Sequence, residues 1–234
     1  MKLSYDFHTH ILPGVDDGAS DTDEALSLIS ALKENGVKKV CLTPHFYTHK
    51  ESFEDFVSRR NAAARDFIPR IQDEVEVKLG AEVFVTPYLF SESRDFSPLC
   101  LTGTNYMLTE FPYSAGFSGE TMKLLLNIRN VGVTPILAHI ERYPKLMKEP
   151  ELVEELIYMG VIIQSNAVSF TDKKLKFKLL KYLKKGYIQI ISSDVHSLRR
   201  NPPSSYKEAT EVFRKKCPDV LPFLERNAEE IWNS

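Results

Sequence analysis

The sequence has few of the features that mark secreted, disulfide-bonded or membrane proteins. It contains three cysteines in 234 residues, namely Cys41, Cys100 and Cys217, which are widely spaced and include no CxxC pair. It has no apolar run of about 18 residues, the length that a membrane-spanning helix needs, and no basic leader before an apolar stretch. We therefore expect reduced thiols in a cytoplasmic protein without membrane insertion.

A strong excess of either charge is also missing. The formal net charge is −2, which argues against a general nucleic-acid or anionic-membrane binder. We interpret the basic run Lys173–Lys185 as the solvated face of a helix. The sequence contains no P-loop, G-x-S-x-G or Cys-x₅-Arg signature, so a covalent serine or cysteine mechanism has no support.

Short apolar segments alternate with helical patterns along the whole chain. The segments lie near residues 3, 38, 75, 106, 134, 161 and 187, and residues 86–104 form the least regular stretch. Asp21 and Ser52 are expected to begin the first two helices, and Ser118 is expected to cap a helix over 119–130. Such alternation indicates parallel strands with right-handed crossovers. We predict an α/β fold, a distorted seven-stranded (β/α)₇ TIM-like barrel, forming one domain over residues 1–234.

Side chains of the types that bind metals stand at the ends of these strands, where barrels of this kind carry their active sites. In the segment Asp6–Gly18, the H-x-H spacing sends both imidazoles to the same side of a strand. Five of the six histidines of the chain lie at strand ends, and carboxylates join them. The candidate metal ligands are His8, His10, Asp17, His45, Glu82, Glu110, His139, Asp194 and His196.

The number of these groups indicates more than one metal ion. Four clustered carboxylates would repel each other without cations, and some would stay protonated. Nine ligands are also too many for one ion with four to six coordination positions. We therefore expect two or three divalent ions. Mixed histidine and carboxylate ligands suit Mn, Fe or Zn and do not decide among them.

Arginines follow two of the candidate ligands. Arg142 comes three residues after His139, and Arg199 and Arg200 follow His196. Guanidinium groups beside metal ions favour a tetrahedral oxyanion such as phosphate. The pattern predicts attack on phosphorus by a metal-bound hydroxide. Five aromatic residues just beyond strand ends have two open interpretations, pocket lining or loop packing: Phe46, Tyr47, Phe111, Tyr113 and Phe117.

Six sequence blocks carry a resemblance to a known family. They are D-F-H-T-H-I-L-P-G-V-D-D-G, L-T-P-H, L-G-A-E-V, L-T-E-F-P, P-I-L-A-H-I-E-R and S-S-D-V-H, spread over residues 6–196. The chain resembles the polymerase-and-histidinol-phosphatase (PHP) superfamily, whose members have a distorted β/α barrel with up to three metals. Within it, the chain is similar to the bacterial manganese-dependent protein-tyrosine phosphatases of capsule and exopolysaccharide synthesis.

This resemblance implies a role for each matching residue. The nine candidate ligands would hold the metals, with Glu82 as the bridging carboxylate and Mn as the expected ion. Arg142 would clamp the phosphoryl group, and either Arg199 or Arg200 would be the second arginine, because the spacing is shifted here. Asp17 or a metal-bound histidine would give a proton to the leaving phenol. The implied substrate is a phosphotyrosine protein, a bacterial tyrosine autokinase, and the oligomeric state stays open.

Three other functions stay open at this point. A small-molecule phosphatase, such as one for histidinol phosphate, would share the same hydrolytic residues. A metal-binding regulatory protein without activity would have no need of a full ligand set. A nuclease or polymerase accessory role is disfavoured by the near-neutral charge. Amidohydrolase barrels also begin with H-x-H, but the chain lacks their bridging lysine at a strand end.

Overall fold

The structure is a computed structural model that describes residues 2–92 and 95–234. Every pairing between its strands is parallel, which confirms the predicted α/β class. The strands are β1 (Tyr5–Thr9), β2 (Lys39–Leu42), β3 (His45–Tyr47), β4 (Glu76–Leu79), β5 (Glu82–Phe84), β6 (Tyr106–Glu110), β7 (Thr134–Leu137), β8 (Ile162–Asn166) and β9 (Ile190–Ser192).

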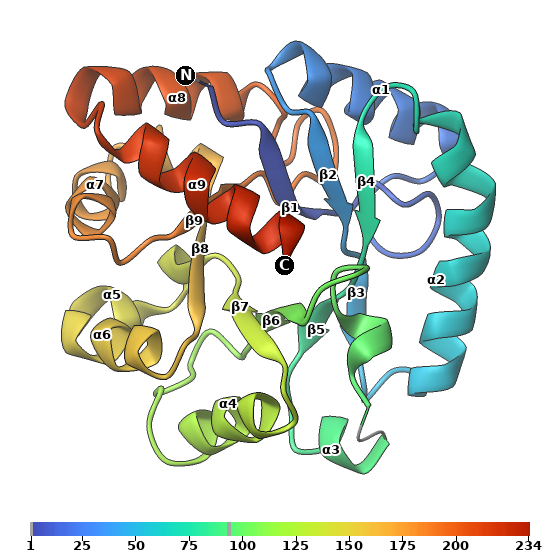
Figure 1. Cartoon of the computed structure of the whole chain (residues 1–234), viewed down its shortest axis with the longest axis horizontal. Coiled ribbons are helices and arrows are strands. Elements are labelled where there is room, and N and C mark those ends of the chain that lie inside the picture. Colours follow the sequence, from blue (N-terminus) through green and yellow to red (C-terminus); the bar gives the residue numbers. More distant parts are fainter. Residues whose placement is uncertain (1, 93–94) are drawn as a thin grey trace.

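Helices surround these strands on several sides (Figure 1). They are α1 (Thr22–Glu34), α2 (Phe53–Phe67), α3 (Leu89–Glu92), α4 (Glu120–Asn130), α5 (Pro144–Lys148), α6 (Pro150–Tyr158), α7 (Lys176–Lys184), α8 (Ser205–Lys216) and α9 (Val220–Asn233). The stretch expected to be irregular, 86–104, holds α3 and a short 3₁₀ turn at Ser97–Leu99, while its residues 93 and 94 lie outside the described part.

The closed seven-stranded barrel is not confirmed. The described strands form one sheet in the order β1-β2-β4 and another in the order β3-β5-β6-β7-β8-β9, and neither sheet closes. The difference arises because the predicted strands near residues 38 and 75 are each followed by a second short strand that belongs to the other sheet. Thr43-Pro44 separates β2 from β3, and proline has no N–H to give to a strand ladder. Gly80-Ala81 separates β4 from β5 in the neighbouring strand.

The first and last strands lie side by side at their carboxyl ends. The backbone N–H of Asp194 donates to the carbonyl of His8 at 2.8 Å, and that of His10 donates to Val195 at 2.9 Å. The register of β1 against β2 shifts between Asp6 and Thr9. Such bulges re-aim side chains next to active sites. The two hydrogen bonds and the register shift together place His8 and His10 beside Asp194 and His196, which come from the other end of the chain.

The structure confirms the predicted cap at Asp21 and the expected helix start at Ser52. The side chain of Asp21 accepts from the N–H of Glu24, and that of Ser52 accepts from Asp55, as each helix begins. The predicted cap at Ser118 is wrong: α4 begins after Gly119, whose φ of 53° suits a residue without Cβ. The helix that begins after Ser52 ends at Phe67 and continues as a 3₁₀ turn that contains a proline.

Two apolar clusters fill the interior. The larger lies between the strands and the helices around them, and the smaller includes Tyr5 and Phe7 of β1 together with Ile231 and Trp232 of α9. Helix α9 therefore covers the beginnings of the strands, while the candidate ligands stand at their ends. Among the described residues, no helix combines the length and the apolarity needed to cross a membrane.

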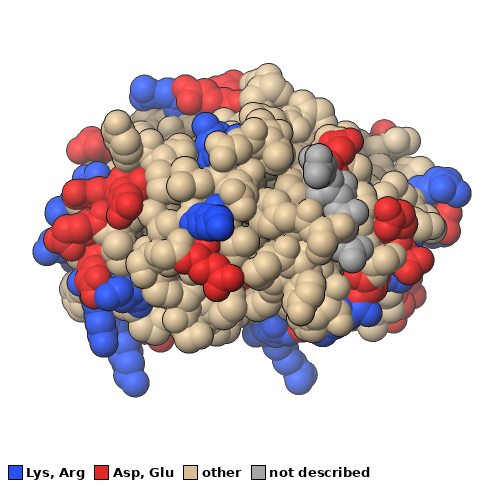
Figure 2. All heavy atoms as spheres, turned by 90° about the horizontal axis from the view of Figure 1, so that it is seen from below, with Lys and Arg blue, Asp and Glu red and all other residues tan. Residues whose placement is uncertain are grey.

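The face seen from below in Figure 1 carries charges of both signs. Figure 2 shows acidic and basic side chains side by side toward the margins of this face, with mostly uncharged residues in the middle. Among the described residues, the basic side chains form no continuous area on this face. They therefore give it no broad basic footprint of the kind that nucleic-acid backbones require.

Candidate metal centre

The loop after β1 turns back against the strand it leaves. The N–H of Ala19 donates to the carbonyl of His10 at 2.9 Å. A Cβ atom built on Gly18 would lie 1.8 Å from that same carbonyl oxygen, so only glycine fits there. This close approach carries the loop residues Asp16 and Asp17 back to the imidazole of His10, which accounts for the D-D-G sequence.

Four donor atoms meet at the inner end of the site. The Nε2 atoms of His8 and His10 lie 3.1 Å apart, and Glu82 Oε2 is 3.1 Å from the first and 3.3 Å from the second. The Oδ1 atom of Asp194 is 3.4 Å from His8 Nε2 and 3.3 Å from His10 Nε2. All four side chains are buried. They come from β1, β5 and the turn after β9.

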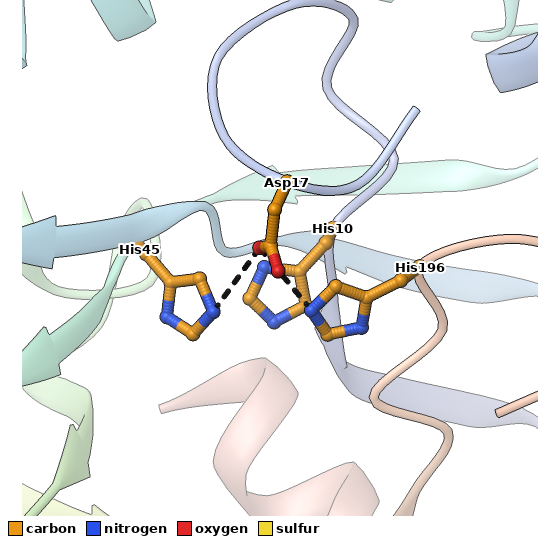
Figure 3. Close-up of side chains that lie close together, drawn as sticks. All are labelled: His10, Asp17, His45 and His196. Carbon is orange, nitrogen blue, oxygen red and sulfur yellow. Dashed lines mark ion pairs between the residues drawn. The ribbon is translucent and has the colours of Figure 1, made fainter. Parts of the chain in front are cut away.

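Two further groups lie around this inner set. In Figure 3 the carboxylate of Asp17 points between the rings of His45 and His196, and each of its two ion pairs measures 3.5 Å. On the other side, His139 Nε2 is 3.0 Å from Glu82 Oε1 and 3.4 Å from Glu110 Oε1. The structure thus brings all nine predicted ligands into one cluster, with Glu82 shared between its parts.

The donors are spaced as the ligands of a metal ion are. With metal–ligand distances of about 2.1 Å, neighbouring ligands of a tetrahedral or octahedral ion lie about 3.0 to 3.4 Å apart. Three groups offer ligand atoms that all lie within 4.8 Å of one another: His8, His10 and Glu82; His45, Glu82 and Glu110; and His10, Asp17, His45 and His196. Within the described residues, the buried Glu82 Oε2 and His196 Nε2 atoms lie near oppositely charged groups but form no hydrogen bond of good geometry. The residues present therefore fit a centre of divalent metals.

The pKa shifts within the cluster show that its buried carboxylates need positive charge beside them. Burial alone would lower the pKa of His10, but the charge of Asp16 and its hydrogen bond raise that pKa well above its usual value. Burial would raise the pKa of Glu82, yet the charge of His8 and hydrogen bonds from histidines hold it well below its usual range. Burial and the nearby charge of His10 lower the pKa of His196 to about 4. Without metal, protons on buried imidazoles take the place of cations beside the carboxylates.

The backbone is strained at two of the candidate ligands. His139 has a φ of 34° and Asp194 a φ of 56°, in the left-handed region that side chains other than glycine rarely adopt. Each such residue costs on the order of 1–3 kcal/mol, and such residues gather at functional sites. Both lie where a strand has just ended. The strain is consistent with a chain that bends in order to aim these two side chains inward.

Side chains that the sequence analysis did not assign hold the ligands in place. Asp16 Oδ2 lies 2.6 Å from His10 Nδ1 and also accepts from the backbone N–H of His45 at 2.9 Å. Asn166 and Asn201 both donate to Asp194 Oδ2, at 2.8 and 3.0 Å. Such partners fix the orientation of ligands.

The sequence held a partial signal for these supporting residues. Asp16 stands in the same D-D-G block as Asp17, and polar residues at 164 and 166 alternate at the end of a predicted strand. Gln164 accepts from the backbone N–H of His139 at 2.5 Å and donates to Asn166 at 2.9 Å. No pattern in the sequence marks Asn201, because its contact depends on how the last loop folds.

Two arginines reach the cluster, and a third does not. Arg142 Nη2 lies 2.5 Å from Asp194 Oδ2, and its Nη1 donates to the hydroxyl of Tyr113 at 3.1 Å. Arg200 Nη1 lies 2.6 Å from Asp17 Oδ2. The side chain of Arg199 has no such contact among the described residues, where only its backbone N–H is bonded, to Ser197. The geometry thus favours Arg200 over Arg199 as the second arginine.

The aromatic residues beyond the strand ends divide into two kinds. Phe46, Phe111 and Phe117 are fully buried and pack in the core, so pocket lining is wrong for these three. The ring of Phe46 stacks on Phe56 at 4.7 Å, for example. Tyr47 and Tyr113 keep part of their surface exposed beside the cluster. The sequence could not separate the two kinds, because all five follow strands at similar distances.

Fold and site together define an α/β protein with a candidate multi-metal centre at its strand ends. Residues 4–232 match the family described as capsular polysaccharide synthesis, CpsB/CapC, and the chain belongs to that family. It is 29% identical over 238 residues to the tyrosine-protein phosphatase CpsB of Streptococcus agalactiae serotype III (strain NEM316), with 97% of each chain covered.

Two further comparisons agree with this family. The chain is 28% identical to the tyrosine-protein phosphatase YwqE of Bacillus subtilis (strain 168), over 96% of this chain and 89% of that one. It also superposes with a TM-score of 0.85 and 26% identity on a chain from crystal structures of YwqE from B. subtilis and CpsB from Streptococcus pneumoniae, described as unique metal-dependent tyrosine phosphatases. That match covers 98% of this chain and 94% of the other. The predicted family is confirmed.

Proposed function

We propose that this chain is a metal-dependent protein-tyrosine phosphatase that acts on a phosphotyrosine protein, a tyrosine autokinase of capsule or exopolysaccharide synthesis. The observation that carries the proposal is the convergence of nine metal-type donors with the guanidinium groups of Arg142 and Arg200 at one strand-end site. The likeness to relatives named tyrosine-protein phosphatases supports the substrate class.

The nine clustered residues would hold two or three divalent ions, with Mn as the expected metal. When bound, such ions act as Lewis acids on the phosphoryl oxygens and activate water for attack at neutral pH. Glu82 suits a position between ions, because its two oxygens face different histidines: Oε2 is 3.1 Å from His8 and Oε1 is 3.0 Å from His139. Asp16, Asn166 and Asn201 keep the ligands in orientation.

Arg142 and Arg200 bind and orient the phosphoryl group in this proposal. Each guanidinium has several donors and already reaches a candidate ligand carboxylate, so both stand at the edge where an oxyanion would sit. The Tyr113 hydroxyl holds Arg142 from the outside. Burial alone would lower the pKa of Arg142, but the charge of Asp194 raises it above its usual value, so the positive charge of Arg142 is permanent.

The leaving phenol needs little acid catalysis from the protein. A phenol has a pKa near 10, so tyrosinate departs with less acid assistance than an alkoxide would. Burial alone would raise the pKa of Asp17, but its hydrogen bond to Arg200 and the histidine charges lower it. Asp17 is therefore ionised at neutral pH, and its role in this proposal is to bind metal and to pair with Arg200 rather than to donate a proton.

We also propose one domain over residues 1–234 and a cytoplasmic location. The three cysteines are buried and unpaired in the described structure, in agreement with reduced thiols. The strands from both chain halves join at β1 and the turn after β9, which supports one folding unit.

The test is phosphate release from a phosphotyrosyl peptide, with Mn²⁺ added and after chelation, with histidinol phosphate assayed alongside. Metal-dependent turnover that prefers the peptide is expected. His139→Ala should abolish it, whereas His49→Ala, at the exposed sixth histidine, serves as the matched control. Preference for histidinol phosphate would overturn the substrate class. Absence of turnover with metal bound would contradict the proposal that the chain is an enzyme and would favour a regulatory metal-binding protein.

A further inference from the structure

A cavity of about 370 Å³ opens directly beside the candidate metal centre. Its inner end is formed by Asp17 and His45, two of the residues drawn in Figure 3. Its outer part is lined by Tyr47, Lys50, Glu51 and Arg59, from β3, the turn after it and α2. No role in the reaction has been given to these four side chains. The cavity thus shares Asp17 and His45 with the site where a phosphoryl group would bind.

The two cations of the cavity differ in their partners. Arg59 is neutralised, because its Nη2 lies 2.6 Å from Glu51 Oε1 and its Nη1 donates to the carbonyl of Val15. Lys50 is exposed and forms no ion pair with any residue in the described part of the chain. Its positive charge is therefore the one at the cavity mouth that an incoming group can still neutralise.

An aromatic wall leads from the metal centre to Lys50. The ring centroids of Tyr47 and His45 lie 5.1 Å apart, and Lys50 Nζ lies over the Tyr47 ring, 4.0 Å from its centroid. The backbone N–H of Lys50 donates to the carbonyl of Tyr47 at 2.9 Å, so a tight turn fixes this placement.

We propose that this cavity receives the peptide segment next to the phosphotyrosine, and that Lys50 selects substrates with an acidic residue in that segment. The inference rests on the proposed phosphatase function, since it needs the phosphoryl group to lie at Asp17 and His45. The Tyr47 ring offers the flat surface along which an aryl group leaves the metal centre. The unpaired ammonium of Lys50 then meets the flanking side chain, and an acidic one complements it.

The test compares phosphotyrosyl peptides that differ only in the residues flanking the phosphotyrosine, with aspartate, alanine or lysine at those positions. Each is assayed with Mn²⁺ on the unmodified protein, on Lys50→Glu and on Lys215→Glu. Lys215 is exposed on α8. In Figure 1 this helix lies at the opposite end of the molecule from the beginning of α2, which Lys50 precedes. The two variants change the net charge equally, so only the position of the change differs.

The unmodified protein should prefer the aspartate over the alanine peptide by about fivefold in kcat/KM, the scale of one exposed ion pair. The preference should appear in KM, because Lys50 contacts bound peptide and not the reacting atoms. Lys50→Glu should invert it toward the lysine peptide, Lys50→Gln should abolish it, and Lys215→Glu should keep it. Circular dichroism spectra that match the unmodified protein verify that each variant is folded.

Two results would overturn the proposal in different ways. Turnover of all three peptides without preference, or equal loss of preference in both glutamate variants, would show that Lys50 does not select the substrate, while the phosphatase function stands. Lack of turnover of every peptide by the unmodified protein would overturn the phosphatase function, and this inference with it.

Discussion

The same strands begin in an apolar cluster and end in a polar one. At their beginnings, the rings of Tyr5 and Phe7 stack at 6.0 Å, and Trp232 of α9 meets them edge-on at 6.0 and 6.4 Å. At their ends, imidazole and carboxylate atoms stand 3.1–3.4 Å apart in a buried cluster. Only a few residues along β1 separate the two environments.

The two ends depend on different physical terms. Burial of the aromatic rings is favourable without any further partner. Burial of carboxylates and imidazoles is unfavourable unless opposite charge accompanies them. The beginnings of the strands should therefore set the stability of the fold, and the ends should gain theirs only with cations.

The largest effect is expected for Glu82→Gln at the polar end. The change keeps the shape of the side chain but removes the charge that four histidines surround. We expect kcat/KM for a phosphotyrosyl peptide to fall by about 10³-fold or more, since metal charge stabilisation is worth several kcal/mol. The fold should persist, as far-ultraviolet circular dichroism would verify. Activity within tenfold of the unmodified protein would rule out Glu82 as a shared ligand.

Trp232→Ala perturbs the apolar end instead. Truncation of this largely buried side chain should lower the free energy of unfolding by about 3–5 kcal/mol. The loss should be the same with and without Mn²⁺ in urea denaturation, because the ring lies in the cluster of Tyr5 and Phe7 and not among the ligands. A loss that depends on metal would mean that the two ends are coupled.

Protons should leave the polar end when metal binds. In the metal-free protein the folded-state pKa of His10 is raised above the unfolded value of about 6.5, mainly by Asp16 against the effect of burial. The resulting stability is present in full below pH 6.5 or so and is lost as the pH rises through the folded pKa.

Because a metal-bound imidazole must be neutral at the ligating nitrogen, Mn²⁺ binding at pH 7 should release about one proton or more. Calorimetric titrations in buffers of different ionisation enthalpy measure this number. Asp16→Asn should reduce it, since the pKa of His10 then loses its main support. Identical heats in both buffers would contradict the proton-for-metal exchange.

The smallest effect separates the two adjacent arginines. Arg200→Ala should raise KM for a phosphotyrosyl peptide by about tenfold, the size expected for a charge-assisted hydrogen bond. Arg199→Ala should leave KM within twofold, because its side chain makes no contact with the cluster among the described residues. Steady-state kinetics on both variants decide the assignment, and the reverse order of effects would exchange their roles.

The sequence predicted which side chains meet at the polar end of the strands, and the reason is simple. In a parallel α/β fold every strand ends at the same edge, so His45, Glu82 and His139 could be placed together from strand boundaries alone. The H-x-H spacing sufficed for the proximity of His8 and His10. These relations are local in sequence and survive small errors in strand length.

What the sequence missed depends on irregular backbone or on three-dimensional packing. After the breaks at Thr43-Pro44 and Gly80-Ala81, the short strands β3 and β5 begin in the other sheet, and the sheets stay unclosed. The left-handed backbone at His139 and Asp194 has no glycine to mark it. The support from Asn201 and the burial of Phe46 follow from how loops and helices pack, which no spacing rule encodes.

Anomalous diffraction at the manganese edge, from crystals of Mn-loaded protein, tests the central claim most directly. The account predicts two or three peaks inside the strand-end cluster, each about 2.0 to 2.6 Å from its ligands, with Glu82 beside more than one of them. Crystals of His139→Ala should lose at least one peak. Mn-loaded crystals without a peak among these residues would contradict the account.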